Sequence, residues 1–448
     1  MADQDPAAPL AILLAARRQG RARHRDARRR AAEAGLRGAG LGAIWLALGL
    51  LALLLGSVLV QGLPAFRAAY IKLDINFDPA RLAPEGDPTR LAPDGETAAA
   101  ALAQADYAPL VAAALERLFP ELADREQRRL LRGLVSIGAA DELRRRLLAD
   151  PGLLGQTRAI WLLADDDVDQ LLKGRIDRAA PAADRRLSDR ALSLIDRLAA
   201  EGRLAQGFSP TLLTAGDSRE PELAGLRGAL VGSLYLLLVT ALLSLPTGIA
   251  AAIYLEELAP RNAITDLIEV NVNNLAAVPS IVFGLLGLAV LLDRLDLPRS
   301  SPLVGGATLA LLVLPTIVVT SRAALRAVPP PIRQAALGIG ASRLQTVTHH
   351  VLPCALPGIL TGAIIGLAQA LGETAPLLLI GMHAFIVDAP RTPLDPATAL
   401  PVQIYLWAGS PEPAFAERAA AAILVLLCVL AVTSGLAALL RSWAERRW

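Results

Sequence analysis

The sequence predicts an all-α integral membrane protein, and three observations support this fold class. Of the 448 residues, 54% are hydrophobic and only 19% are charged, with a mean hydropathy of +0.46. This composition excludes a disordered chain and an ordinary soluble domain. Six segments reach the roughly 20 apolar residues needed to cross a bilayer. A long polar stretch, residues 61–226, separates the first of these segments from the second.

Each apolar segment is expected to be a helix, because backbone groups cannot stay unpaired in hydrocarbon. The six expected spans are Leu41–Val60, Ala229–Leu255, Leu275–Leu292, Leu303–Ser321, Ala355–Gly381 and Ala419–Leu440. A kink or break is expected at mid-depth in the fifth span, where Pro376 removes a helix hydrogen bond just after Thr374. Pro246, Pro279 and Pro315 are further candidates for kinks in their spans.

The arginines predict the orientation. Nine arginines precede the first span, four occupy residues 322–350 without any acid, and three follow the last span. Six crossings place these regions on one side, which the positive-inside rule makes cytoplasmic, so both termini are expected there. The loop at 256–269 is acidic on balance and is the exception. An arginine-rich tail could also bind nucleic acid or acidic lipid, but we interpret it as a topology signal and expect no nucleic-acid partner.

This topology divides the chain into four parts. They are a basic cytoplasmic tail (1–40), a first transmembrane helix (41–60), an extracytoplasmic insert domain (61–226) and a core with five transmembrane helices (227–448). Apolar residues at helical spacing within the insert indicate that it is mainly helical, in stretches such as 97–118, 125–148 and 184–201.

No metal site is expected. The only two cysteines, Cys354 and Cys428, lie in or beside apolar spans, and the adjacent His349 and His350 cannot share one helix face as a zinc pair would. The acidic run at 165–169 lacks the glycine and terminal glutamate of a calcium loop, so we expect it to be a solvated turn.

The segment 329–353 has the form of a docking element. Its three consecutive prolines stop the fourth span and can start a new helix. Short helices are expected at 332–337 and 341–347, separated by a glycine-rich turn that allows a sharp reversal. Small side chains before the turn leave a flat patch able to accept a partner's groove. The simpler alternative is an ordinary helical hairpin in a loop.

Glu373 is the one carboxylate in the fifth span. A charged side chain at a helix centre costs ~2.5–3.5 kcal/mol on insertion scales, so it is rarely kept without a partner or a water-lined path. Gln369 lies one turn earlier on the same face, so an ionic pair within this helix is excluded. Either Glu373 is protonated, or the cation comes from Arg322 or from a partner permease. The alternative is a neutral, hydrogen-bonded glutamate that locks packing.

The chain is not expected to be an enzyme. A phosphate-binding loop needs Gly-Lys-Ser or Gly-Lys-Thr, whereas the only two lysines, Lys72 and Lys173, follow Ile71 and Leu172. We therefore expect no cofactor bound by this chain and a separate subunit that hydrolyses ATP.

The segment 329–353 resembles the coupling motif of binding-protein-dependent ABC importers, written EAA, three residues, Gly, nine residues, then I-x-L-P. Gln334 replaces the glutamate and His350 the isoleucine, while the family spacing is kept. The glutamine keeps size and hydrogen bonding but loses charge. The resemblance implies ATPase coupling through Gln334, Ala335, Ala336, Gly338, Gly340, Leu352 and Pro353.

Two further segments narrow the family. Asn273–Leu285, NNLAAVPSIVFGL, is similar to the third-span signature of phosphate importers, and Gly372–Leu378 is similar to the GETAPLL segment of their PstA-type permeases. The resemblance covers 227–448 and implies a MetI-like permease core in the bacterial inner membrane. It also implies a PstC-like second permease, two PstB-like ATPase subunits and an extracytoplasmic phosphate-binding protein. The expected path or gate residues are Glu373, Thr374, Gln369, Asn274, Ser280 and Arg322.

Two alternatives stay open. A permease for another oxyanion, sulfate or molybdate, has the same architecture but is disfavoured by GETAPLL. A membrane sensor that uses the insert to detect a ligand should carry a cytoplasmic kinase or effector domain, and only short cytoplasmic segments occur here.

Overall fold

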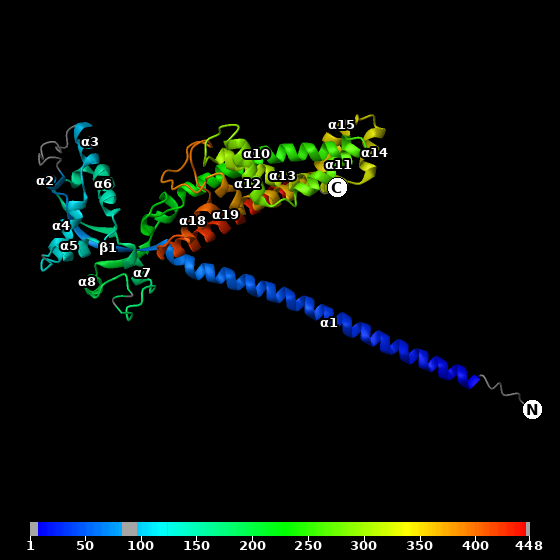
Figure 1. Ribbon diagram of the computed structural model, residues 1–448, viewed down its shortest axis with the longest axis horizontal. Coiled ribbons are helices and arrows are strands. Elements are labelled where there is room, and N and C mark those ends of the chain that lie inside the picture. The colour runs from blue at the N-terminus through cyan, green and yellow to red at the C-terminus, as the bar shows by residue number, and fades with distance from the viewer. Residues whose placement is uncertain (1–7, 83–95, 123, 182, 184, 445–448) are drawn as a thin grey trace, which may run out of the picture. The chain divides into compact units, whose positions relative to one another are not determined.

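The computed structural model describes residues 8–82, 96–122, 124–181, 183 and 185–444. It has two compact units, Met1–Val60 and Gln61–Trp448. The first unit is almost entirely the long helix α1 (Ala8–Gly62), which contains the first expected span. The second unit contains the insert and the helical core (Figure 1). Every contact described below lies within this unit.

The insert contains a three-stranded antiparallel sheet in the order β2-β1-β3. Its strands are β1 (Arg67–Asn76), β2 (Thr157–Leu163) and β3 (Leu204–Phe208), with Tyr70 of β1 opposite both Leu163 and Ala205. The sequence reasoning missed this sheet. A period-two pattern in β1, with Ile71, Leu73 and Ile75 all fully buried, carried the strand signal.

Helices make up most of the rest of the insert, as predicted. They are α2 (Pro79–Leu82), α3 (Glu96–Gln104), α4 (Ala108–Leu118), α5 (Arg125–Arg132), α6 (Ala139–Ala149), α7 (Asp166–Leu172), α8 (Asp189–Ala200) and α9 (Thr211–Thr214). The apolar faces of α4, α6 and α8 and the buried side chains of β1 form one hydrophobic core, in which Tyr107, Phe77 and Phe119 are the largest buried residues. The insert has no cysteine, so this core and the sheet hold it together without a disulfide.

The core that follows is all-helical. It consists of α10 (Arg227–Ile253), α11 (Ala263–Leu275), α12 (Ser280–Leu286), α13 (Pro302–Arg326), α14 (Pro330–Gly338), α15 (Arg343–Thr346), α16 (Leu352–Gly372), α17 (Ala375–Leu379), α18 (Leu400–Ala408) and α19 (Ala414–Ala444). Within the described residues, five helices are long and apolar enough to cross a membrane, and the bent pair α11–α12 raises the number to six if it counts as one span. The predicted fold class is therefore confirmed.

The third span is not the single helix expected at Leu275–Leu292. It is a pair of helices, Ala263–Leu275 and Ser280–Leu292, bent by 105° at the break between them. Pro279 has extended backbone angles, φ −57° and ψ 138°, directly before α12. A proline ring disfavours helical geometry in the residue before it and suits the start of the next helix, so the chain stops and restarts here.

The fifth span also differs from its expected limits of Ala355–Gly381. A continuous helical stretch begins at Arg343 and ends at Gly372, so the second short helix expected at 341–347 is instead the first turn of the span. The expected break is confirmed. It falls at Glu373, whose angles are φ −77° and ψ 129°, because Pro376 lies in the first turn of the new helix α17. Helices α10 and α13, in contrast, run on through Pro246 and Pro315.

Small residues allow the core helices to approach closely. Helices α10 and α13 lie side by side (Figure 1). A Cβ at Gly306 of α13 would come within 2.6 Å of the Val239 side chain on α10, and one at Gly362 of α16 would come within 2.0 Å of Thr320 Oγ1 on α13. These three helices are therefore packed backbone to side chain, without room for larger residues at the contacts.

Candidate functional site

The two broken spans pack against each other. A Cβ at Gly284 of α12 would lie 2.7 Å from Pro376 Cα of α17, and one at Gly287 would lie 3.3 Å from Ile380 Cγ2. The structure thus joins the two segments singled out in the sequence, Asn273–Leu285 and Gly372–Leu378, through a contact that only glycine permits. Nothing in either segment alone indicated this pairing.

Glu373 lies at the break in the fifth span. Its backbone ends α16, donating a hydrogen bond to the Ala370 carbonyl at 3.3 Å, and its side chain is half-buried. None of the described residues forms an ion pair or hydrogen bond with its carboxylate. Thr374, the next residue, is also half-buried, and Gln369 is exposed on the last turn of α16. The carboxylate therefore depends on water or on another molecule for solvation.

The other expected path residues lie in two places. Asn274 and Ser280 flank the break in the third span, exposed and half-buried respectively. Arg322 is 7% exposed near the end of α13, where its Nη2 lies 2.8 Å from Glu269 Oε2 and its Nε lies 3.3 Å from Glu256 Oε2. The expectation that Arg322 could serve Glu373 is therefore wrong.

An ion-pair network surrounds Arg322. Arg326, one turn further along α13, donates from Nε to Glu256 Oε2 at 2.8 Å and lies 3.6 Å from Glu269 Oε1. Glu256 comes from the π-helical turn Tyr254–Leu258 that continues α10, and Glu269 comes from α11. The acidic 256–269 loop, the exception to the arginine rule, thus supplies the countercharges for the arginines of α13.

A second ion pair ties α14 to α10. Arg333 Nη2 lies 2.6 Å from Glu257 Oε1, and the same guanidinium donates to the Leu325 and Val328 carbonyls at 2.8 and 2.6 Å. All three nitrogens of this guanidinium thus donate locally, since Nε also donates to Glu257. The start of α14 is thereby fixed to the ends of both α10 and α13.

The expected glycine-rich turn follows α14. Gly340 has φ +92°, a conformation that favours glycine, and Ser342 caps α15 in a capping box with Gln345. Gln334, Ala335 and Gly338 are exposed as expected, whereas Ala336 is buried.

Apolar side chains around the turn were missed in the sequence. Leu337, Ile339 and Leu344 are 48%, 80% and 60% exposed. Exposed apolar groups gathered at one turn are typical of an interaction surface. At the other end of the motif, Leu352 and Pro353 are half-buried, and Pro353 lines a cavity of about 350 Å³ together with Pro329 and Ile332.

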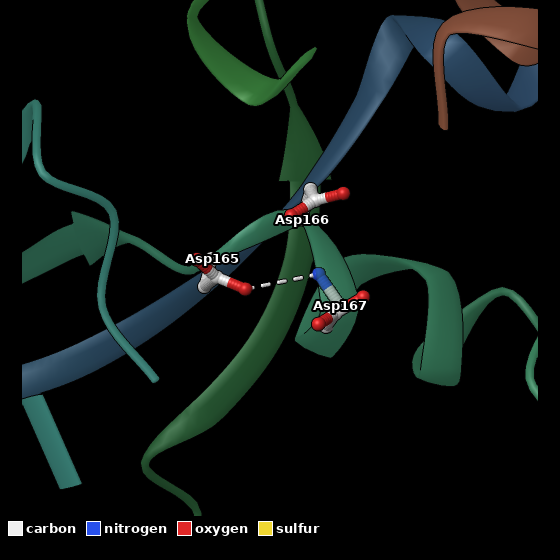
Figure 2. A group of neighbouring side chains, drawn as sticks. All are labelled: Asp165, Asp166 and Asp167. Carbon is white, nitrogen blue, oxygen red and sulfur yellow. Dashed lines mark hydrogen bonds between the residues drawn. The ribbon is translucent and has the colours of Figure 1, made fainter. Parts of the chain in front are cut away.

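A second charged region lies where the insert meets the core. The Asp165–Asp167 run is not the solvated turn expected, since Asp166 is only 8% exposed. Asp165 caps α7 by accepting from the Asp167 N–H at 3.1 Å (Figure 2). Arg186 lies 3.3 Å from Asp167 and 2.7 Å from Glu412. Burial, with a smaller contribution from neighbouring carboxylates, raises the pKa of Asp165 to about 7 and that of Asp166 to about 6.

Two more contacts fasten the insert to the last helices. Lys173 Nζ of the insert lies 2.6 Å from both Asp169 and Glu417, and all three side chains are at most 8% exposed. Trp407 of α18 donates to Asp217 at 3.1 Å. The insert is therefore held to α18 and α19 through buried polar groups.

The helical core combines two broken spans with an exposed turn at Gly340, an arrangement that fits a membrane permease. Comparison with known proteins identifies its family. Residues 244–446 match the model of the binding-protein-dependent transport system inner membrane component, and residues 23–182 match a domain of unknown function, DUF3333. The chain is therefore a permease of an ABC importer and a multi-pass membrane protein.

Individual relatives are more specific. The chain is 35% identical over 225 residues to phosphate transport system permease protein PstA 1 of Mycobacterium tuberculosis, covering 50% of this chain and 72% of that protein. It is 32% identical over 224 residues to PstA of Haemophilus influenzae, covering 50% and 78%. The probable ABC transporter permease protein YqgI of Bacillus subtilis is 34% identical over 194 residues, covering 40% of this chain and 65% of YqgI. The chain belongs to the PstA family of phosphate transport system permeases.

Among solved structures, the inward-facing MetNI methionine ABC transporter aligns at 17% identity with a TM-score of 0.41. The alignment covers 49% of this chain and 96% of that one.

Proposed function

We propose that this chain is the transmembrane permease subunit of an ATP-driven importer for inorganic phosphate in the bacterial inner membrane. It would pair with a second, PstC-like permease and two PstB-like ATPases, and would receive phosphate from an extracytoplasmic binding protein. Both termini would be cytoplasmic and the insert extracytoplasmic. The contact of Gly284 with Pro376 carries the proposal, because it joins the two phosphate-importer segments at the breaks of two spans.

The breaks are the natural place for the translocation path. Transporters commonly use discontinuous helices at mid-membrane, where free backbone groups and polar side chains face the substrate. Asn274 and Ser280 flank one break, and Thr374 lies at the other. A carboxylate in such a path would repel phosphate, so we assign Glu373 to gating or to pairing with a cation of the second permease.

Coupling to ATP hydrolysis would run through α14 and α15. The exposed turn with Leu337, Ile339 and Leu344 would dock on the ATPase, together with Gln334 and Ala335. Arg333 transmits a displacement of α14 to α10 through Glu257. Glu256, next to Glu257, pairs with Arg326 of α13, and Arg322 of α13 pairs with Glu269 of α11. Helix α11 ends at the break at 276–279. This chain of contacts links ATPase motion to the path.

The substrate and the role of Glu373 are tested together by uptake into vesicles that contain all the subunits. We expect ATP-dependent uptake of labelled phosphate over sulfate and molybdate.

Glu373→Gln should reduce uptake at least tenfold with assembly unchanged, because the neutral amide cannot pair with the partner's cation. Asp293→Asn, an exposed acid after the third span, is the control and should transport normally. Sulfate uptake without phosphate uptake would refute the substrate, and uptake by Glu373→Gln would favour a packing role.

Docking is tested at the turn. Gly340→Val should reduce co-purification of the ATPase several-fold, because a β-branched residue at φ +92° costs of order 1–3 kcal/mol and would reshape the turn. Gly202→Val is the matched control, since Gly202 also has a positive φ, +66°, but lies in the insert, and a Cβ there meets nothing within 4 Å. Equal ATPase recovery with the two variants, measured by pull-down from detergent extracts, would place docking elsewhere.

A further inference from the structure

Two cavities adjoin each other where the insert meets the loop between α17 and α18, residues 380–399. One has a volume of about 900 Å³ and the other of about 810 Å³, and Arg227, Phe385 and Val387 line both of them. The loop and the insert are in direct contact there, because a Cβ at Gly216 would overlap the Val387 carbonyl oxygen. Phe385 and Val387 are nevertheless 50% and 55% exposed, so they present apolar side chains to both cavities. The two cavities together are called the insert cleft.

The outer face of the sheet forms one wall of the larger cavity. Ile71 of β1 is buried in the hydrophobic core, and Tyr70 points to the opposite face, because successive side chains of a strand alternate. Leu163 is opposite Tyr70 in the register, so Leu163 and Trp161 share this outer face. All three side chains line the cavity, and Trp161 is 39% exposed. The insert thus leaves an aromatic surface open beside Phe385 of the core.

Two of the three acids that line the larger cavity are held by arginines of α6. Asp141 pairs with Arg144, and Glu142 pairs with both Arg145 and Arg146. Arg145 and Arg146 also line the cavity. Because these two arginines share one acid, this part of α6 has an excess of positive charge.

Arg227 adds a further positive charge. It is the first residue of α10 and is exposed, and its guanidinium forms no ion pair or hydrogen bond with any residue that the structure describes. The third acid of the larger cavity, Asp217, accepts from Trp407 Nε1 at 3.1 Å. Four arginines thus meet three acids in and around the larger cavity. The smaller cavity is balanced, with two arginines and two aspartates: Arg227, Arg391, Asp388 and Asp395.

We propose that the insert cleft is the docking surface for the extracytoplasmic phosphate-binding protein, which would present an acidic patch surrounded by apolar side chains. This inference rests on the proposed function, in which the insert is extracytoplasmic, and it assigns a role to the insert. Tryptophan, tyrosine and arginine carry most of the binding energy at protein interfaces. Complementary charge adds specificity and speeds association. A phosphate ion is far smaller than either cavity, so the cleft fits a protein surface and not the free ion.

Docking at this cleft would act on the broken fifth span. The 380–399 loop starts at the end of α17, and Pro376 of α17 contacts Gly284 of α12. Tyr235 of α10 donates to the Arg391 carbonyl at 2.8 Å, which ties the same loop to the first core helix. A displacement of the loop would therefore reach the break at Glu373 through a continuous set of contacts.

The test uses the whole transporter in nanodiscs and the purified, phosphate-loaded binding protein. The wild type should bind that protein saturably. Trp161→Ala and Arg227→Glu should each weaken binding at least tenfold with subunit assembly unchanged, because one removes an aromatic contact and the other reverses a charge. Phe208→Ala and Arg129→Glu are the matched controls and should bind normally, since both side chains are exposed on the insert and neither lines the cleft. A photo-crosslinking residue at position 385 should capture the binding protein, and one at position 208 should not.

Uptake of labelled phosphate in the same preparations separates this inference from the proposed function. Normal uptake by the wild type, together with unchanged affinity in both cleft variants, would overturn docking at the cleft and leave the proposed function intact. A wild type that neither binds the protein nor takes up phosphate would overturn both. Equal losses of affinity in the cleft variants and in their controls would also overturn the cleft as the docking surface.

Discussion

Replacing Arg322 with methionine is expected to lower the free energy of unfolding by about 3 kcal/mol and to uncouple ATP hydrolysis from uptake. The Arg322 side chain is only 9% exposed. Among the described residues, its loss leaves the partly exposed Arg326 as the remaining cation paired with Glu256 and Glu269. Breaking a buried ion pair costs about 3–5 kcal/mol. The lower end applies because Arg326 still reaches both glutamates.

The loss would be measured as a shift in thermal unfolding in one detergent, with ATPase activity and uptake followed in parallel. Arg326→Met is the control. Its side chain is 56% exposed, and pairs of this kind contribute roughly 0–1 kcal/mol. The double variant Arg322→Met with Glu269→Gln should recover part of the stability, because it removes one of the stranded charges. Equal melting temperatures for the two single variants would show that the network does not hold the ends of α10, α11 and α13 together.

The ion pairs of Arg322 and Arg326 could not be predicted from the sequence, because they join different helices. Length and apolar composition predicted the spans, because each is a property of a single helix. The third span began too late in the prediction because α11 carries Asp266, Glu269 and Asn271, which lower its hydropathy. That polarity is offset in part by Arg322 and Arg326 from another helix. Hydropathy is averaged along one segment of the sequence, so it cannot show a charged partner on another helix.

Part of the candidate path could be predicted, because some of its features are properties of a single helix. Pro376 indicated a break in the fifth span, and Gln369 indicated that the partner of Glu373 lies outside that helix. The partner could not be chosen from periodicity, which describes only the faces of one helix. Only the fold shows that Arg322 is already paired, and that Gly284 meets Pro376.

The insert was the least predictable part. The alternation in β1 was readable, but the abundance of alanine and leucine favoured helices throughout. The acidic run at 165–167 looked solvated because its charged neighbours Glu222 and Glu412 lie far away in the chain. In the sequence, the two lysines indicated only that a phosphate-binding loop is absent. In the fold, Lys173 is buried between two carboxylates.

Lys173→Met is therefore expected to destabilise the attachment of the insert by about 3–5 kcal/mol near neutral pH, the cost of leaving a buried charge unpaired. Methionine fills a similar volume, so the loss reflects charge more than packing. Lys72→Met, the only other lysine, is the matched control. Lys72 is half-buried over the Trp161 ring at 5.8 Å, a contact that contributes about 0.5–1 kcal/mol.

The pH dependence separates charge from packing. Burial raises the pKa of Asp169, and Lys173 opposes that shift; without the lysine, the pKa rises further. The folded variant then holds a proton that the unfolded chain releases, so its stability declines as pH rises from the unfolded pKa, about 3.9, to the folded one. The defect measured by thermal unfolding should thus be smaller at pH 5 than at pH 8. A defect of equal size at both values would mean that lost packing, rather than stranded charge, loosens the insert from α19.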